Sequence, residues 1–161
     1  KNITLHHGGV SSENGALKLF IPKPEGGTSP GATLEQREDT SSGHFQEVPV
    51  YKLDDLLKDR TQKIALIKLD VEGHELEVFK GAKEILLKDK PTIVFECENR
   101  HLQNLQVEDV FEFLVSLGYA GFFFDQGELI SIKNFDASIH QKTNNNEIVD
   151  KTHYANNFVF A

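Results

Sequence analysis

The sequence contains no methionine, a single cysteine and no long hydrophobic run among its 161 residues. A translation product starts with methionine, whereas this sequence starts with Lys1 and enters the strand-like segment Ile3-Thr4-Leu5, so we expect it to begin partway through a domain. The single Cys97 excludes an internal disulfide, so the fold does not depend on an oxidising compartment. No apolar run approaches the roughly 20 residues of a membrane-spanning helix, and Lys1 to Leu5 do not form a signal peptide.

Basic residues are also scarce, because 17 lysines and arginines stand against 25 aspartates and glutamates, for a net charge of −8. A nucleic-acid backbone or an anionic membrane surface requires clustered positive charge, so both are excluded as partners. The 39% hydrophobic and 26% charged residues are typical of a globular domain, and the length suits one domain that buries roughly 70% of its unfolded surface. We therefore predict a single domain in the cytoplasm.

The first sixty or so residues carry short strand signals separated by turns and one long loop. Strands are predicted at Ile3–His7, which Gly8-Gly9 ends, and at Ala16–Ile21. Residues 22–46 are rich in Pro, Gly, Ser and Thr, which predicts a flexible loop insertion. An extended segment at Val48–Tyr51 and a short helix at Leu53–Leu57 follow.

From residue 64 the hydrophobic pattern becomes stronger. The nearly continuous apolar run of Ile64–Val71 is typical of a strand buried on both faces, and a helical stripe follows Gly73. Residues 134–153 are polar and predict a loop. The remaining predicted elements are the strand Thr92–Cys97, a helix over Val107–Val115 ended by Gly118, a hairpin of Tyr119–Phe124 with Leu129–Ile132, and the strand Asn157–Phe160. This order predicts a doubly wound α/β fold with a mostly parallel sheet and an antiparallel edge hairpin.

Two of the predicted strands end in carboxylates. Asp70 and Glu72 follow the first strand, and Glu96 and Glu98 follow the second. Ligands of open α/β sheets bind beyond the carboxyl ends of the strands, so these acids are expected on one rim of the sheet. Asp70 or Glu72 has two interpretations at this point: it caps the helix that begins near Gly73, or it binds a ligand or takes part in catalysis.

A metal site is a further hypothesis for the same segment, because oxygen ligands suit Mg²⁺ or Ca²⁺. Successive residues at a helix start point in different directions, so few of Asp70, Glu72, His74 and Glu75 can meet at one ion. Glu75 and Glu77 are most simply solvated charges of the first helical turn. We therefore predict no metal.

The remaining reactive residues favour structural roles. His6 and His7 cannot both face one ligand from an extended strand, because neighbours alternate faces. Cys97 is interpreted as a small buried hydrophobe whose thiol pKa is raised by the adjacent Glu96 and Glu98. No G-x-S-x-G, Walker A or G-x-G-x-x-G motif is present.

The segment Ile67–Ala82, IKLDVEGHELEVFKGA, resembles the I-K-[IL]-D-V-E-G-x-E-x-x-[VA]-[LF]-x-G-A signature of the FkbM-type methyltransferases. Its flanks resemble the family as well, so the likeness covers essentially the whole chain. These flanking segments are Val48-Pro49-Val50, Leu53–Leu57, Pro91–Glu96, Leu117-Gly118-Tyr119 and Asn157–Phe160.

The resemblance implies a class I, Rossmann-like methyltransferase fold, S-adenosylmethionine as cofactor, and O-methylation of a hydroxyl on a sugar or natural product. The acceptor is then a small molecule or a glycan, and a homo-oligomer is left open. By the same resemblance, Asp70 with Val71 falls beside the methionine and methyl end of the cofactor. The implied roles of the other residues are adenine contacts for Gly9, Val10 and Ser11, substrate or base roles for Glu72 and Glu96, and a weaker base role for His74.

The sequence departs from the family at its start. It contains no D-x-G-A-N-x-G loop and no following strand that ends in a ribose-binding acid, so the N-terminal strands and most of the cofactor site are expected to be missing. The leading hypothesis is the C-terminal portion of a methyltransferase that by itself binds its cofactor weakly. The alternatives are a non-catalytic interaction domain derived from the same fold, and an acidic metal-binding module around Asp70 and Glu72.

Overall fold

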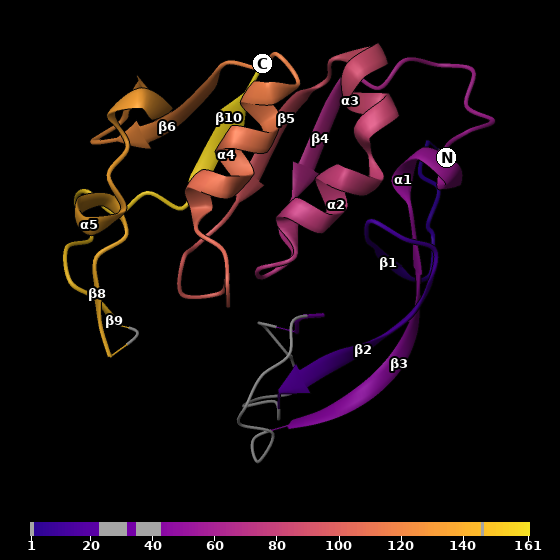
Figure 1. Cartoon of the computed structure of the whole chain (residues 1–161), viewed down its shortest axis with the longest axis horizontal. Coiled ribbons are helices and arrows are strands. Elements are labelled where there is room, and N and C mark those ends of the chain that lie inside the picture. Colours follow the sequence, from indigo (N-terminus) through magenta and orange to yellow (C-terminus); the bar gives the residue numbers. More distant parts are fainter. Residues whose placement is uncertain (1, 23–31, 35–42, 146) are drawn as a thin grey trace.

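The computed structural model describes residues 2–22, 32–34, 43–145 and 147–161, which form two main sheets (Figure 1). The first sheet has the strand order β1-β3-β2, in which β1 runs parallel and β2 antiparallel to β3. The strands β2 and β3 form a long hairpin that extends away from the rest of the chain (Figure 1). The bounds are Gly9–Val10 for β1, Gly15–Pro22 for β2 and Gly43–Tyr51 for β3.

The second sheet has five strands in the order β4-β5-β10-β6-β7. Their bounds are Leu66–Leu69, Thr92–Glu96, Asn157–Phe160, Gly121–Asp125 and Glu128–Ser131 in that order. The pair β4–β5 is parallel, and the other three pairs are antiparallel. The predicted mixed α/β fold and its edge hairpin β6–β7 are confirmed, but the mostly parallel sheet holds only in part. The reason is β10, which returns from the carboxyl ends of β5 and β6 and inserts between them.

The described helices α2, α3 and α4 lie on one face of the five-stranded sheet (Figure 1). The core between them is aromatic: Phe95 and Phe158 are 0% exposed, and their rings lie 5.5 Å apart. Phe111 of α4 packs edge-on against Phe158 at 4.7 Å. The helix bounds are Leu53–Leu56 for α1, Glu75–Gly81 for α2, Lys83–Asp89 for α3 and Val107–Ser116 for α4. Among the described residues, no helix is both long and apolar enough to cross a membrane.

The single helix predicted after Gly73 is wrong, because the chain breaks at Ala82 into α2 and α3. The second helix has its own N-terminal acceptor: the carboxylate of Asp54 in α1 accepts the backbone N–H groups of Glu84 and Ile85 at 2.9 and 3.0 Å. These N–H groups would otherwise lack partners at the start of a helix. The apolar stripe continues through the break, which is why the sequence pattern shows one helix.

Other predictions need correction near the N-terminus. The segment Ile3–His7 is not a strand, since no described strand pairs with it. Of the predicted loop at residues 22–46, Pro22 belongs to β2 and residues 43–46 belong to β3, while residues 23–31 and 35–42 lie outside the described residues. The hairpin register pairs Phe20 with Phe45, whose rings are 5.4 Å apart.

The predicted loop at residues 134–153 also contains regular structure. It begins at the end of the 3-10 helix η1 and includes a helix and a two-stranded hairpin. Their bounds are Ile132–Asn134 for η1, Ala137–His140 for α5, Thr143–Asn144 for β8 and Glu147–Ile148 for β9. The carboxylate of Asp136 accepts the N–H of Ser138 at 2.9 Å and so caps α5, and this local bond explains order in a polar segment.

The aromatic core predicts a stability contrast between two phenylalanines. Phe158→Ala removes a fully buried ring and should lower the free energy of unfolding by about 3–5 kcal/mol. Phe124→Ala, at a side chain that is 50% exposed, should cost under about 1 kcal/mol. Urea unfolding of both variants measures the difference, and equal losses would show that the sheet does not pack as described.

Candidate functional site

The turn between β4 and α2 has an unusual backbone. Glu72 has φ of +53° and Gly73 has φ of +103°, so two successive residues are left-handed. Such a conformation suits glycine and costs roughly 1–2 kcal/mol for a residue with a side chain. The carbonyl of Glu72 accepts the hydroxyl of Thr33 at 2.8 Å, and the N–H of Gly73 donates to the buried carboxylate of Glu75 at 3.0 Å. These bonds from two sides hold the turn in place.

The capping interpretation of Asp70 and Glu72 is wrong. The helix begins at Glu75, its N-cap residue His74 makes no side-chain cap bond, and Glu75 accepts the N–H of Gly73 itself. Asp70 is exposed, and no described group hydrogen-bonds to its carboxylate. The side chain of Glu72 pairs instead with His101, Oε2 to Nδ1, at 3.1 Å. The carboxylate of Asp70 is therefore available to a ligand.

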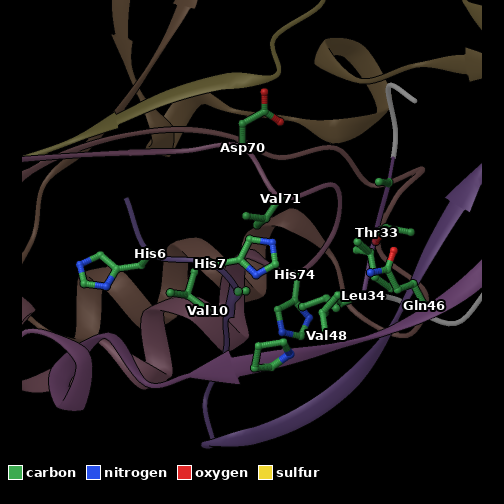
Figure 2. A pocket seen from close by; sticks show the side chains of 15 residues that line it. His6, His7, Val10, Thr33, Leu34, Gln46, Val48, Asp70, Val71 and His74 are labelled. Atoms are coloured by element: carbon green, nitrogen blue, oxygen red, sulfur yellow. The ribbon is translucent and has the colours of Figure 1, made fainter. Parts of the chain in front are cut away.

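A pocket of about 590 Å³ lies between this turn and the β2–β3 hairpin (Figure 2). It brings together four of the five residues predicted to contact a cofactor: Gly9, Val10, Asp70 and Val71. The fifth, Ser11, follows Val10 in the sequence and is buried, and its hydroxyl oxygen lies 2.9 Å from the Nε2 atom of His74. The other lining residues are His6, His7, Gly8, Leu19, Ala32, Thr33, Leu34, Gln46, Val48, Pro49 and His74.

His6 and His7 both line this pocket, so the prediction that they cannot face one ligand is wrong. That prediction depended on a strand, and the described chain at Ile3–His7 is irregular. Figure 2 shows His6, His7 and His74 around the same hollow, with Asp70 at its upper end. Sequence spacing gave no signal for this arrangement.

Glu72 and Glu96 do not line the pocket and belong to the adjacent acidic rim. Burial raises the pKa of Glu96, and the nearby carboxylates of Asp70, Glu98 and Glu72 raise it further. One oxygen of Glu96 accepts the amide of Asn156 at 2.8 Å, and it accepts no other hydrogen bond from the described residues. This rim confirms that the two strand ends bring their acids together, as expected from parallel strands.

Glu98 differs from Glu96 because both of its carboxylate oxygens accept hydrogen bonds. It accepts two bonds from Arg100, at 2.7 and 2.9 Å, and a further bond from the hydroxyl of Tyr154. Although burial opposes this, the bonds from Arg100 and Tyr154 lower the pKa of Glu98, so it is held as a carboxylate. Glu98 therefore organises the rim and is not free to take a proton.

Sequence reasoning missed Tyr154 and Asn156, which reach the rim from the segment before β10. The signal was present, because an antiparallel strand starts at the edge where its parallel neighbours end. His153 of the same segment binds Asp125 at the end of β6, Nδ1 to Oδ1, at 2.9 Å. Three side chains thus fasten this segment across the ends of β5 and β6.

Glu75 is 1% exposed, so its interpretation as a solvated charge is wrong. Its second carboxylate oxygen lies 3.6 Å from the thiol of Cys97. Burial raises the pKa of Glu75 and also that of Cys97. The nearby carboxylate of Glu75 raises the pKa of the Cys97 thiol further. The predicted direction for Cys97 is confirmed, but burial and Glu75 contribute more than its sequence neighbours.

Among the described residues, no group of three or more His, Cys, Asp or Glu side chains has an arrangement that could hold a metal. Around Asp70, the side chain of Glu72 pairs with His101 and that of Glu75 accepts the N–H of Gly73, so the two carboxylates do not meet at one point.

The sequence profile of the methyltransferase FkbM domain matches residues 1–120. The chain belongs to the FkbM methyltransferase family. Among solved structures, the methyltransferase FkbM from Methylobacillus flagellatus KT is similar, with 17% sequence identity and a TM-score of 0.45. The alignment covers 71% of the present chain and 24% of the Methylobacillus chain, so the present chain spans about a quarter of the length of that protein. The comparison with curated proteins gave no match.

Within this FkbM domain, the family signature gains a physical explanation. The D-V-E-G part forms the left-handed turn, and the glutamate that follows it after one residue, Glu75, is the buried acceptor of the Gly73 N–H. The catalytic roles of Asp70, Glu72, Glu96 and His74 stay predictions. For His74 the geometry adds that its Nε2 atom lies within hydrogen-bond distance of the Ser11 hydroxyl.

Glu75 predicts a distinctive pH dependence of stability. Its pKa is raised in the folded state, so the stability of the folded chain falls as pH rises from about 4.5 through the raised pKa. Glu75→Gln keeps an oxygen acceptor for Gly73 without the charge. The variant should therefore gain stability over the wild type at neutral pH, on the order of 1 kcal/mol, and the gain should vanish near pH 4. Thermal unfolding across this pH range measures it, and a gain independent of pH would refute the account of Glu75.

Proposed function

We propose that this chain forms part of an S-adenosylmethionine-dependent methyltransferase that methylates a hydroxyl group of a sugar or natural product. The observation that carries the proposal is the pocket that gathers Gly9, Val10, Asp70 and Val71. By resemblance to the FkbM family these residues have a cofactor role, and they come from two separate segments. Family membership supports methyl transfer as the reaction.

The residues present fit this cofactor. The volume of about 590 Å³ lies within the range of small-molecule pockets. S-adenosylmethionine carries a sulfonium and an ammonium group, and the carboxylate of Asp70 is an anion with no hydrogen-bond partner among the described residues. Opposite charges at such a site attract more strongly than in water. Apolar side chains such as Val71 and Leu34 suit the uncharged parts of the molecule.

Glu96 is the base that we propose for the acceptor hydroxyl. The bound cofactor supplies an electrophilic methyl group, so the hydroxyl oxygen must lose its proton as it accepts that methyl. One oxygen of Glu96 is bonded to Asn156, which leaves the other oxygen to take the proton. Its raised pKa brings the carboxylate closer to neutral pH, where a base is more effective. Glu72 lies on the same rim and has a substrate-binding role in this proposal.

A non-catalytic interaction domain is the second candidate, and a specific surface favours it. In the strand register Leu66, Phe124 and Leu129 alternate with the buried residues that face the helices, so they lie on the other face of the five-stranded sheet, and they are 50–60% exposed. Exposed apolar surface of this kind is typical of interaction sites. An interaction domain of this sort would not bind the cofactor.

Titration with S-adenosylhomocysteine separates the two candidates. We expect the chain to bind it with a dissociation constant above 1 µM, as weak binding follows from the absence of the D-x-G-A-N-x-G loop. Asp70→Asn should weaken binding about tenfold, which corresponds to one charge-assisted interaction. The matched control is Asp59→Asn, an exposed acid that does not line the pocket. No heat or spectral change at millimolar ligand would favour the interaction domain, whereas binding with equal affinity in the Asp70 variant would remove Asp70 from the cofactor site.

Methyl transfer itself tests Glu96. In an assay with labelled S-adenosylmethionine and a panel of hydroxyl acceptors, Glu96→Gln should lower kcat about 10²–10⁴-fold. The wild-type rate should fall as pH drops through the pKa of Glu96, which lies above 4.5, because the protonated carboxyl cannot accept a proton. The variant should lack this acidic limb. A variant that keeps the wild-type rate and pH profile would remove Glu96 from the mechanism.

A further inference from the structure

One face of α2 is bonded to the two serines that follow β1. His74 at the N-cap lies 2.9 Å from the hydroxyl of Ser11, Nε2 to Oγ. The carboxylate of Glu77 accepts the hydroxyl of Ser12 at 2.5 Å. At Gly81 the backbone of Ser11 comes so close that a Cβ atom would overlap its carbonyl oxygen. We call His74, Glu77 and Gly81 the α2 clamp.

The spacing of the α2 clamp follows from helix geometry. Residues three and seven positions after His74 lie on the same side of a helix with 3.6 residues per turn. Glu77 is held ionised: burial opposes this, but bonds from Lys80 and Ser12 lower its pKa. The bond from Ser12 is therefore charge-assisted, which makes it stronger than a neutral one. The prediction that Glu77 is a simple solvated charge of the first turn holds only in part, because its side chain is 32% exposed but also accepts the Ser12 hydroxyl.

The segment Gly9–Ser11 is also fixed from its other side, by β3. Gly9 and Val10 pair in parallel with Val50 and Tyr51 of β3, and the N–H of Ser11 donates to the carbonyl of Tyr51 at 2.9 Å. Gly9 and Val10 line the pocket, whereas Ser12, Glu77 and Gly81 do not. A ligand in the pocket thus meets a wall whose position depends on contacts behind it.

We propose that the α2 clamp positions the Gly9–Val10 wall of the pocket relative to Asp70 and thereby sets the affinity for the nucleoside part of the methyl donor. This inference rests on the proposed function, since it names the ligand of the same pocket. Asp70 precedes the β4–α2 turn and the clamp residues follow it, so the contacts of His74 and Glu77 with Ser11 and Ser12 relate the segment after Val10 to Asp70. Glu77 and Gly81 of the clamp, together with Ser12, are positioning residues, because they act through Gly9 and Val10 without lining the pocket, whereas His74 also lines it.

The test uses Ser12, which lies behind the wall. Ser12→Ala removes the hydroxyl that Glu77 accepts, Ser12→Thr restores a hydroxyl, and Ser116→Ala is the matched control at an exposed serine of α4. The dissociation constants of S-adenosylhomocysteine and of adenosine are measured for each variant. Ser12→Ala should weaken both ligands by the same factor, about tenfold, and Ser12→Thr should recover most of the loss. Asp70→Asn should weaken S-adenosylhomocysteine alone.

Amide hydrogen exchange in the free protein gives a second measurement that needs no ligand. Ser12→Ala should speed exchange at Val10 and Ser11 and leave the amides of β5 unchanged, because the contact is local. Faster exchange with unchanged affinity for both ligands would overturn this inference and leave the proposed function standing. A wild-type chain that binds neither ligand would overturn the proposed function, and unchanged exchange in Ser12→Ala would overturn the clamp itself.

Discussion

The buried carboxylate of Glu75 accepts the N–H of Gly73, and the geometry of the whole site depends on this bond. It stabilises a turn in which Glu72 and Gly73 are both left-handed. Asp70 lies at the start of this turn, between β4 and α2, and its side chain is exposed. The carboxyl group of Glu75 is almost fully removed from water in this arrangement, and burial raises its pKa as a result. Buried polar groups of this kind persist when their bonds fix a functional loop.

Two consequences follow from the turn. On one side, Asp70 and Val71 enter the pocket whose opposite wall is the β2–β3 hairpin, and Thr33 connects that hairpin to the carbonyl of Glu72. On the other side, Glu72 joins Glu96 on the acidic rim. Carboxylates that crowd together raise one another's pKa, and such groups are common in active sites. The pocket and the rim therefore share one short loop, which is the arrangement that a cofactor and an acceptor require.

Much of this arrangement could be predicted from the sequence, since strong hydrophobic periodicity marks β4, β5 and α4. Gly118, predicted to end the helix after residue 115, has φ of +87° just beyond α4. The family signature also pointed to Asp70 and Val71, which do line the pocket. These features are local, so a few neighbouring residues determine them.

What could not be predicted depends on contacts between distant segments. The break at Ala82 requires Asp54 from another helix, and the burial of Glu75 depends on Cys97 and the core around it. His6 and His7 enter the pocket because their segment is not a strand, which no pattern in that segment indicated. Tyr154 reaches Glu98 across 56 residues of sequence. Such long-range pairs are set by the tertiary fold, which overrides local propensity.

The most direct test of the central claim is to map where S-adenosylhomocysteine binds, by following backbone amide chemical shifts during a titration. The proposed cofactor site predicts that the largest changes occur at Gly9 and Val10 and at Val71, which line one pocket although Val71 is distant from the other two in sequence. Changes confined to other segments, or no changes at saturating ligand, would contradict it.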